Sequence, residues 1–175
     1  MTMDLTRRQL LQRASIVGAF SALASNPALG QLMRAPRLIP WRNWSGAQSC
    51  LPAARLAPKN LDELTAVIRQ AQGTIRPVGS AHSFSALVPT DGTLLSLSYF
   101  TGLLDHDPKN LQAEFAAGTP MSRMGMPLKD VGQALQNMAD IDYQTLAGAI
   151  ATSTHGTGKN FQSYSAHVCG MQLVT

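Results

Sequence analysis

The 175-residue chain holds few cysteines, few aromatic side chains and no long apolar run, and each shortage excludes a class of protein. Its two cysteines, Cys50 and Cys169, are too few and too far apart for a disulfide framework or a zinc site. We expect two separate, partly buried thiols, with a single bridge in an oxidising compartment as the alternative. Because no apolar run reaches the roughly 18 residues of a membrane-spanning helix, a multi-span membrane protein is excluded.

Charged residues make up only 14% of the chain, and their distribution does not favour a nucleic-acid partner. The formal net charge is +4, but residues 1–30 hold three arginines and one aspartate, so part of the basic excess lies there. Nucleic-acid-binding proteins usually carry a basic stripe with interleaved aromatic side chains. Aromatic residues make up 6% of this chain and are scattered, so we expect no nucleic-acid partner.

Residues 1–30 have the layout of an export signal. The pair Arg7-Arg8, followed by two leucines, resembles a twin-arginine signal, and a mild uncharged stretch from Ala14 to Ala24 follows it. A helix breaker and small side chains then suit a signal peptidase, so we expect cleavage near residue 30 and a linker over residues 31–37. This predicts periplasmic export of a folded protein by the twin-arginine machinery. An amphipathic N-terminal helix and a retained membrane anchor are the alternatives.

The middle of the chain alternates helical and strand patterns. Asn60 and Glu63 form a capping-box-like start, and apolar residues recur at helical spacing until Gly73 ends the helix. Residues 74–78 are short and β-branched, which predicts a strand running into a glycine turn. Residues 94–100 alternate apolar and polar side chains, which predicts a half-buried strand.

The last third predicts a turn, a strand, a helix and a final strand. Turn-forming residues fill 105–110, and residues 111–117 return as a strand. Pro120 opens a helix in which Pro127 marks a kink or a late start. The apolar face of that helix consists of Met121, Met124, Leu128, Val131 and Leu135. Residues 166–175 look like a strand that stops without a turn or cap, so we expect a domain interrupted at Thr175.

The first candidate site follows the predicted strand 74–78. Its residues are Pro77, Val78, Gly79, Ser80, Ala81, His82 and Ser83. A turn built on glycine and small or hydroxylated residues can aim several backbone N–H groups at an anion and let a diphosphate approach the backbone. His82 adds a nucleophilic imidazole to the same turn. The alternative is an ordinary Gly-Ser turn with an exposed histidine.

The second candidate site is a run of small and hydroxylated residues from Thr145 to Gly158. Small residues permit close packing against a ligand, and hydroxyl groups can donate to phosphate oxygens. The run is not a P-loop, because Ser153 stands where a glycine is needed and Asn160 follows Lys159. No GxGxxG motif occurs either, which disfavours a Rossmann dinucleotide site. A lone histidine such as His155 is more often a structural hydrogen-bonding group than a catalyst.

Two other chemistries find no support. The four histidines, His82, His106, His155 and His167, show no HxH, HExxH or carboxylate spacing, so we expect no metal site. No GxSxG elbow occurs, so a serine hydrolase is not expected.

The order of the two loops and of the segments around them resembles a known family. Trp41–Gly46 precedes the first helix, and Arg76–Phe84 follows it; Gly118–Pro120, Asp140–Asp142 and Gln144–Gly158 come next. Together they are similar to the N-terminal FAD-binding half of the vanillyl-alcohol oxidase superfamily, over about residues 38–175. Within it the chain most resembles sugar-1,4-lactone oxidases (gulonolactone and D-arabinono-1,4-lactone oxidases) and alditol oxidase.

The resemblance implies an α+β fold, a PCMH-type FAD-binding domain of two small α/β subdomains that is truncated at the C-terminus and lacks the substrate domain. It implies that residues 77–83 wrap the FAD diphosphate and that His82 bonds covalently to the flavin 8α carbon. A second set of cofactor contacts would come from Thr145, Gly148, Thr152, Ser153, Thr154, His155 and Gly156. Thr145 occupies a position that also touches substrate.

The implied reaction is oxidation of a CH–OH group of a sugar lactone or polyol, with hydride transfer to flavin. Oxygen would then take the electrons and give H2O2, or another acceptor would take them. Substrate-binding residues of this family come largely from the C-terminal domain, so we expect no catalytic residue in this chain and an inactive isolated fragment. The alternatives are a truncated, non-catalytic remnant and a flavin dehydrogenase of the same superfamily that uses another acceptor.

Overall fold

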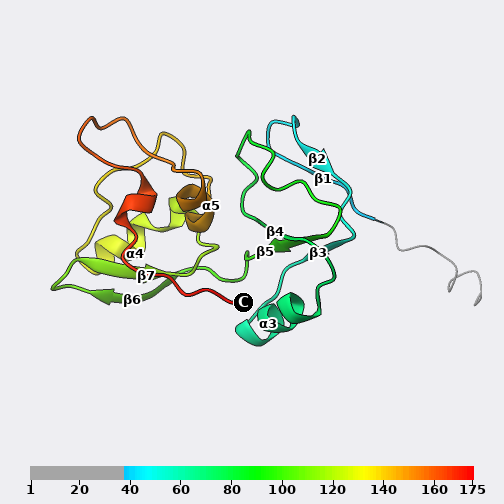
Figure 1. Cartoon of the computed structure of the whole chain (residues 1–175). Helices are drawn as coiled ribbons and strands as arrows, with labels where there is room; N and C mark the ends of the chain where they lie inside the picture. Colours follow the sequence, from blue (N-terminus) through cyan, green and yellow to red (C-terminus); the bar gives the residue numbers. More distant parts are fainter. Residues whose placement is uncertain (1–37) are drawn as a thin grey trace, which may run out of the picture. The chain divides into compact units, whose positions relative to one another are not determined.

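The computed structural model describes residues 38–175, which make up the compact unit Leu38–Thr175 (Figure 1). The predicted export signal and linker, residues 1–37, lie outside the described residues, so that prediction is not tested. Within the described range, none of the helices has the length and apolar character needed to cross a bilayer. Cys50 and Cys169 are both free thiols, the first partly buried and the second exposed.

The first part of this unit is built on a small parallel sheet. The short strands β1 (Trp41–Arg42) and β2 (Ser49–Cys50) pair antiparallel. The strands β3 (Ala54–Leu56), β4 (Ile75–Val78) and β5 (Thr93–Ser96) then form a parallel sheet in the order β3-β5-β4. Helix α3 (Leu61–Gln70) connects β3 to β4. All three parallel strands therefore end at the same edge of the sheet.

The second part combines a hairpin with short helices. The strands β6 (Leu103–Asp107) and β7 (Gln112–Phe115) pair antiparallel, with an irregularity between Leu103 and Asp105. The helical segments are η1 (Met121–Arg123), α4 (Gly125–Asp130), α5 (Leu146–Ala151) and η2 (Tyr164–His167). They bury one apolar cluster, which consists of Met121, Met124, Leu128, Ala149 and Tyr164.

Local chemistry explains the best-defined helix. Asn60 Oδ1 accepts a hydrogen bond from the Glu63 backbone N–H at 2.8 Å, and Glu63 Oε2 accepts from the Lys59 N–H at 2.8 Å. This reciprocal arrangement satisfies N–H groups that have no partner inside the helix. Gly73 follows the helix with φ +83°, a conformation that favours glycine. The predicted helix and the strand after it are therefore confirmed as α3 and β4.

The predicted strand 94–100 is shorter and more deeply buried than expected. β5 ends at Ser96, and the Phe100 N–H then donates to the Leu97 carbonyl in a turn. Thr93, Leu94 and Leu95 are all buried, so the strand is not half-buried as the alternation predicted. The reason is its central position between two parallel neighbours, where consecutive side chains can be buried on both faces of the sheet.

The elements after residue 100 match the expectations in part. The hairpin confirms the strand predicted over 111–117, but β6 runs on to Asp107, so the turn begins at Pro108 rather than at residue 105. The helix expected after Pro120 splits into η1 and α4, and Pro127 lies in the first turn of α4, which is the predicted late start. Val131 caps α4, and Leu135 packs on the apolar cluster from outside any helix.

The predicted strand 166–175 is wrong. Tyr164–His167 form a 3-10 turn, and residues 168–175 have no regular structure. The buried Tyr164 fixes this segment, because its N–H donates to the Thr154 carbonyl at 2.9 Å and its hydroxyl accepts from the Ala139 N–H at 2.8 Å. A strand also needs a partner, and no described strand pairs with this segment.

The hairpin turn gives a first testable result. Hydrogen bonds to the Asp107 carboxylate, chiefly from the Asn110 side chain, lower the pKa of Asp107 below its ordinary value of 3.8. A lowered folded-state pKa means that this turn adds stability above the ordinary pKa and loses it as the pH falls through the lowered value. An NMR titration of the Asp107 carboxyl should therefore give a pKa below 3.8. Asn110→Ala should raise it, whereas Lys109→Ala, which keeps the backbone donor, should not.

Candidate functional site

The loop after β4, residues 79–85, is here named the His82 loop. It begins at the carboxyl edge of the parallel sheet, the edge where open α/β sheets bind ligands. The His82 imidazole lies between two rings: it stacks on Trp44 with ring centroids 5.1 Å apart and on Tyr143 with centroids 5.9 Å apart. Neither ring nitrogen of His82 has a hydrogen-bond partner within residues 38–175. The imidazole is thus held by stacking while its nitrogens stay available.

These rings line a cavity of about 420 Å³ together with Phe84 and Ile141. Phe84 meets the Trp44 ring edge to face, with centroids 6.1 Å apart. Trp44, Phe84 and Tyr143 are each about two-thirds exposed (65%, 68% and 69%), which is unusual for side chains of this size. Exposed aromatic walls around a hollow are typical of a site for a flat, apolar ligand.

The backbone of the His82 loop presents unpaired donors. Within the described chain, the N–H groups of the four residues from Ser80 to Ser83 donate to no protein acceptor. Ala81 has φ +60°, an uncommon conformation for a residue with a side chain. Successive N–H groups around such a residue form the concave turn that binds anions. This geometry fits the predicted diphosphate-binding turn.

The structure brings the two candidate loops together. The Ser80 hydroxyl donates to the Tyr143 carbonyl. Gly79 packs so closely on Thr145 that a Cβ at position 79 would collide with Thr145 Oγ1 and lie 3.4 Å from Thr145 Cβ. Residues 79–80 and residues 143–145, far apart in the sequence, are therefore in contact.

The start of the second loop is structural. Thr145 is the N-cap of α5, and its Oγ1 accepts a hydrogen bond from the Gly148 N–H at 3.3 Å. The next two N–H groups, of Leu146 and Ala147, donate to carbonyls of residues 119 and 117. Within the described chain, the N–H groups of the first turn of α5 thus all have protein partners.

Most of the other predicted contacts in this loop are also engaged internally. Thr152 Oγ1 donates to the Gly148 carbonyl at 3.0 Å, and Thr154 Oγ1 accepts from Gln144 Nε2 at 2.9 Å. Ser153 has φ +51°, the same uncommon region as Ala81. His155 Nδ1 lies 2.9 Å from the Gly156 carbonyl oxygen, and Gly156 packs against Met138 and Asn137. No hydrogen bond joins residues 152–156 to the His82 loop within the described chain.

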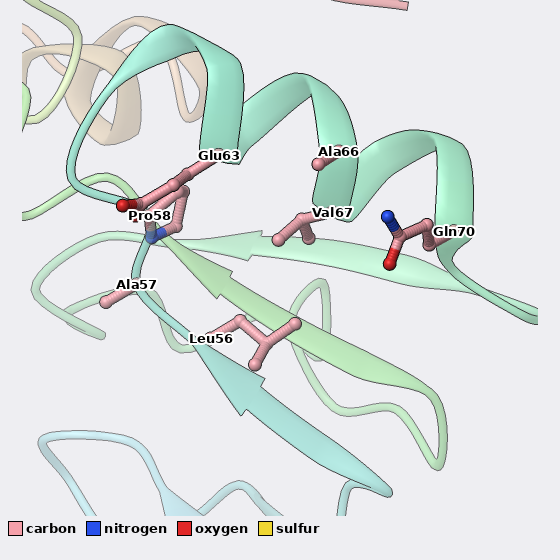
Figure 2. Close-up of a pocket in the computed structure, with 7 residues that line it drawn as sticks. All are labelled: Leu56, Ala57, Pro58, Glu63, Ala66, Val67 and Gln70. Atoms are coloured by element: carbon pink, nitrogen blue, oxygen red, sulfur yellow. The ribbon is translucent and has the colours of Figure 1, made fainter.

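A second hollow, of about 300 Å³, lies between α3 and the end of β3. Figure 2 shows Val67 of α3 and Leu56 of β3 on opposite sides of it. Its one carboxylate, Glu63, is already used in the cap of α3. We therefore do not place a functional site there.

Two rings of the site were not predicted from the sequence. Trp44 belongs to a segment that was quoted only for the family resemblance, and Tyr143 was not singled out at all. Trp44 is one of only two tryptophans in the chain, and that rarity was a usable signal. Tyr143 gave no such signal, because only the tertiary fold places it on His82.

Comparisons with known proteins point to one family. The profile of a family described as "FAD binding domain" matches residues 52–175. L-gulono-1,4-lactone dehydrogenase of Mycobacterium tuberculosis (strain H37Rv) is 38% identical over 138 residues, which cover 77% of this chain and 32% of that protein. D-arabinono-1,4-lactone oxidase of Eremothecium gossypii is 33% identical over 141 residues, covering 77% and 26%. The chain thus spans about a third or less of the length of these relatives.

Solved structures show the same fold. Cholesterol oxidase from B. sterolicum aligns with a TM-score of 0.54 at 19% identity, covering 71% of this chain and 26% of that one. Alkyldihydroxyacetonephosphate synthase aligns with a TM-score of 0.51 at 18% identity, covering 58% and 21%. At these identities the likeness concerns the fold alone.

Proposed function

Because the chain belongs to the family of FAD-binding domains, we propose that it forms the flavin-binding part of an oxidoreductase that oxidises a CH–OH group of a sugar lactone or polyol. The resemblance to the vanillyl-alcohol oxidase superfamily and the expected α+β fold are confirmed. Relatives named as lactone oxidases and dehydrogenases support the substrate class. The observation that carries the proposal is the pairing of free N–H groups with an aromatic cavity at His82.

The residues present fit FAD. A diphosphate carries two negative charges, and the unpaired N–H groups of residues 80–83 are the donors that such a group needs. Residues 77–79 lead from β4 into this turn, and Gly79 allows close packing on Thr145 of the second loop. The N–H groups of His155 and Gly156, which donate to no acceptor in the described chain, are further candidate donors. When bound, FAD supplies the two-electron acceptor for substrate oxidation.

We further propose that His82 carries the flavin covalently. An imidazole nitrogen would replace one hydrogen of the flavin 8α-methyl group, and the N–C bond would form with loss of two protons and two electrons. Oxygen or another acceptor must take those electrons for the step to balance. Support comes from the stacked position of His82 in the aromatic cavity and from its unpartnered ring nitrogens.

Mixing the flavoprotein, purified from its natural source, anaerobically with candidate substrates tests the substrate class. We expect sugar-1,4-lactones or alditols to bleach the oxidised flavin absorbance, and simple primary alcohols to do so at least tenfold more slowly, as expected where a site binds hydroxyl groups by hydrogen bonds. If no lactone or polyol bleaches the flavin, the proposed substrate class is wrong. An oxygen electrode and a peroxide assay then distinguish an oxidase, which we propose, from a dehydrogenase that passes electrons to another acceptor.

We also propose periplasmic export through the twin-arginine machinery, on the strength of Arg7-Arg8 and the mild uncharged stretch after them. Replacing both arginines by lysine keeps the charge but removes the paired guanidinium groups. We expect this double variant to accumulate as precursor in the cytoplasm, as measured by cell fractionation and mass spectrometry. Arg13→Lys is the matched control and should be exported normally. Normal processing of the double variant would contradict the proposal.

A further inference from the structure

A short loop that precedes the sheet holds the His82 loop by its carbonyl groups. This segment, residues 43–48, is here named the Asn43 loop. The Trp44 N–H donates to the Ala81 carbonyl at 2.9 Å, and Asn43 Nδ2 donates to the Ser83 carbonyl at 3.1 Å. A third, longer contact runs from Gln48 Nε2 to the carbonyl of residue 84 at 3.4 Å. Three carbonyls of one loop thus face a single neighbouring segment.

Asn43 is the anchor of this arrangement. It is only 5% exposed, yet both ends of its amide have partners. Its Oδ1 accepts from the Gln48 N–H at 2.9 Å, and its Nδ2 contacts Ser45 Oγ at 3.1 Å in addition to the Ser83 carbonyl. Its backbone closes the Asn43 loop through Gln48 and Gly46. A buried polar side chain that is fully satisfied fixes one geometry, because each lost partner costs a desolvated group.

Four N–H groups of the His82 loop stay free within residues 38–175, while carbonyl groups of the same loop are bound. With the carbonyls of Ala81 and Ser83 bound to the Asn43 loop, the N–H groups of residues 80–83 have no acceptor in the described chain. The same segment places the Trp44 ring on the His82 imidazole, with an interplanar angle of 21°. We propose that Asn43 and Trp44 are positioning residues, which hold the free N–H groups and the imidazole of the His82 loop in place for the FAD diphosphate and the flavin ring. The inference rests on the proposed function.

Asn43→Asp tests the anchor, because it keeps the size of the side chain but puts a carboxylate oxygen opposite the Ser83 carbonyl. We expect apoprotein with this substitution to attach added FAD about tenfold more slowly, the factor that corresponds to one lost hydrogen bond. Ser45→Ala is the matched control, since it removes the second contact of Asn43 Nδ2 and leaves the bond to the Ser83 carbonyl in place. Its rate should stay within about twofold of the unsubstituted rate.

A second readout does not need the covalent bond. In a His82→Ala background, Asn43→Asp should raise the dissociation constant for FAD about tenfold, measured by quenching of FAD fluorescence. Should the unsubstituted protein carry no acid-stable flavin, covalent attachment at His82 is wrong, and this measurement still decides the positioning role. Unchanged attachment rate or unchanged FAD affinity in a folded Asn43→Asp variant would overturn the inference.

Two substitutions of Trp44 cover the case in which Asn43→Asp does not fold. Trp44 is 65% exposed, and its backbone donor survives substitution, so neither Trp44→Leu nor Trp44→Phe should lower the melting temperature. Leucine removes the ring that stacks on His82, and phenylalanine keeps a ring there. We expect Trp44→Phe to attach flavin clearly faster than Trp44→Leu at equal stability. Equal attachment rates in the two variants would contradict the positioning role.

Discussion

The His82→Ala variant should lose all flavin that stays with the protein after acid denaturation. His82 is the histidine that lines the aromatic cavity, and its ring nitrogens have no hydrogen-bond partner in the described chain. Alanine removes the only nucleophile that we propose for the flavin bond. Dissociable FAD should still bind weakly, because the N–H groups of residues 80–83 belong to the backbone. In-gel flavin fluorescence and peptide mass spectrometry measure both forms.

His155→Ala is the matched control. His155 is the other histidine of the candidate loops, but its Nδ1 lies 2.9 Å from the Gly156 carbonyl oxygen, and it is not in the aromatic cavity. This variant should keep its acid-stable flavin. Unchanged acid-stable flavin in His82→Ala would refute the assignment, and its loss in His155→Ala alone would move the attachment to the second loop.

The sequence predicted the elements that are stabilised by contacts between neighbouring residues. The cap of α3 lies within four residues, so Asn60 and Glu63 could be recognised from the sequence alone. The turn and the second strand of the β6–β7 hairpin could be recognised for the same reason, whereas β6 was not predicted. Strands β1, β2 and β3 have two or three residues each, too few for any periodicity to show, and they form because partners far along the chain pair with them. The wrong strand at 166–175 had the pattern of a strand but no partner.

The candidate site divides in the same way. The His82 loop could be predicted, because a short strand, a glycine and small residues are neighbours in the sequence. The rings around His82 could not, since Trp44 and Tyr143 reach it from distant segments. The second loop was expected to contact the cofactor through backbone and hydroxyl groups, and that remains a prediction. The structure adds that the Thr145 and Thr152 hydroxyl oxygens also make hydrogen bonds within the loop's own helix. The small residues of this loop predicted close packing, but the sequence did not show which residues the loop packs against.

Gly79→Ala should weaken both folding and FAD binding, because the new methyl group would occupy the space of the Thr145 hydroxyl. Overpacking of this kind typically costs about 1–3 kcal/mol of unfolding free energy. The loops must separate to admit the methyl group, so we also expect the dissociation constant for FAD to rise about tenfold, as it does for each 1.4 kcal/mol. Urea unfolding and fluorescence titration of the purified protein measure the two effects.

A control and a compensating change identify the cause. Gly125→Ala places its methyl group in open space at the start of α4, so it should leave FAD affinity unchanged and not lower the unfolding free energy.

Thr145→Ala alone should lower the unfolding free energy by about 1 kcal/mol, because α5 loses its N-cap. In the double variant, the hydroxyl that the new methyl group at position 79 would meet is gone. The double variant should therefore lose less stability than the two single losses together, since the sites are in direct contact. Strictly additive losses would mean that residues 79 and 145 do not join the two loops, and the contact that assembles the flavin site would have to lie elsewhere.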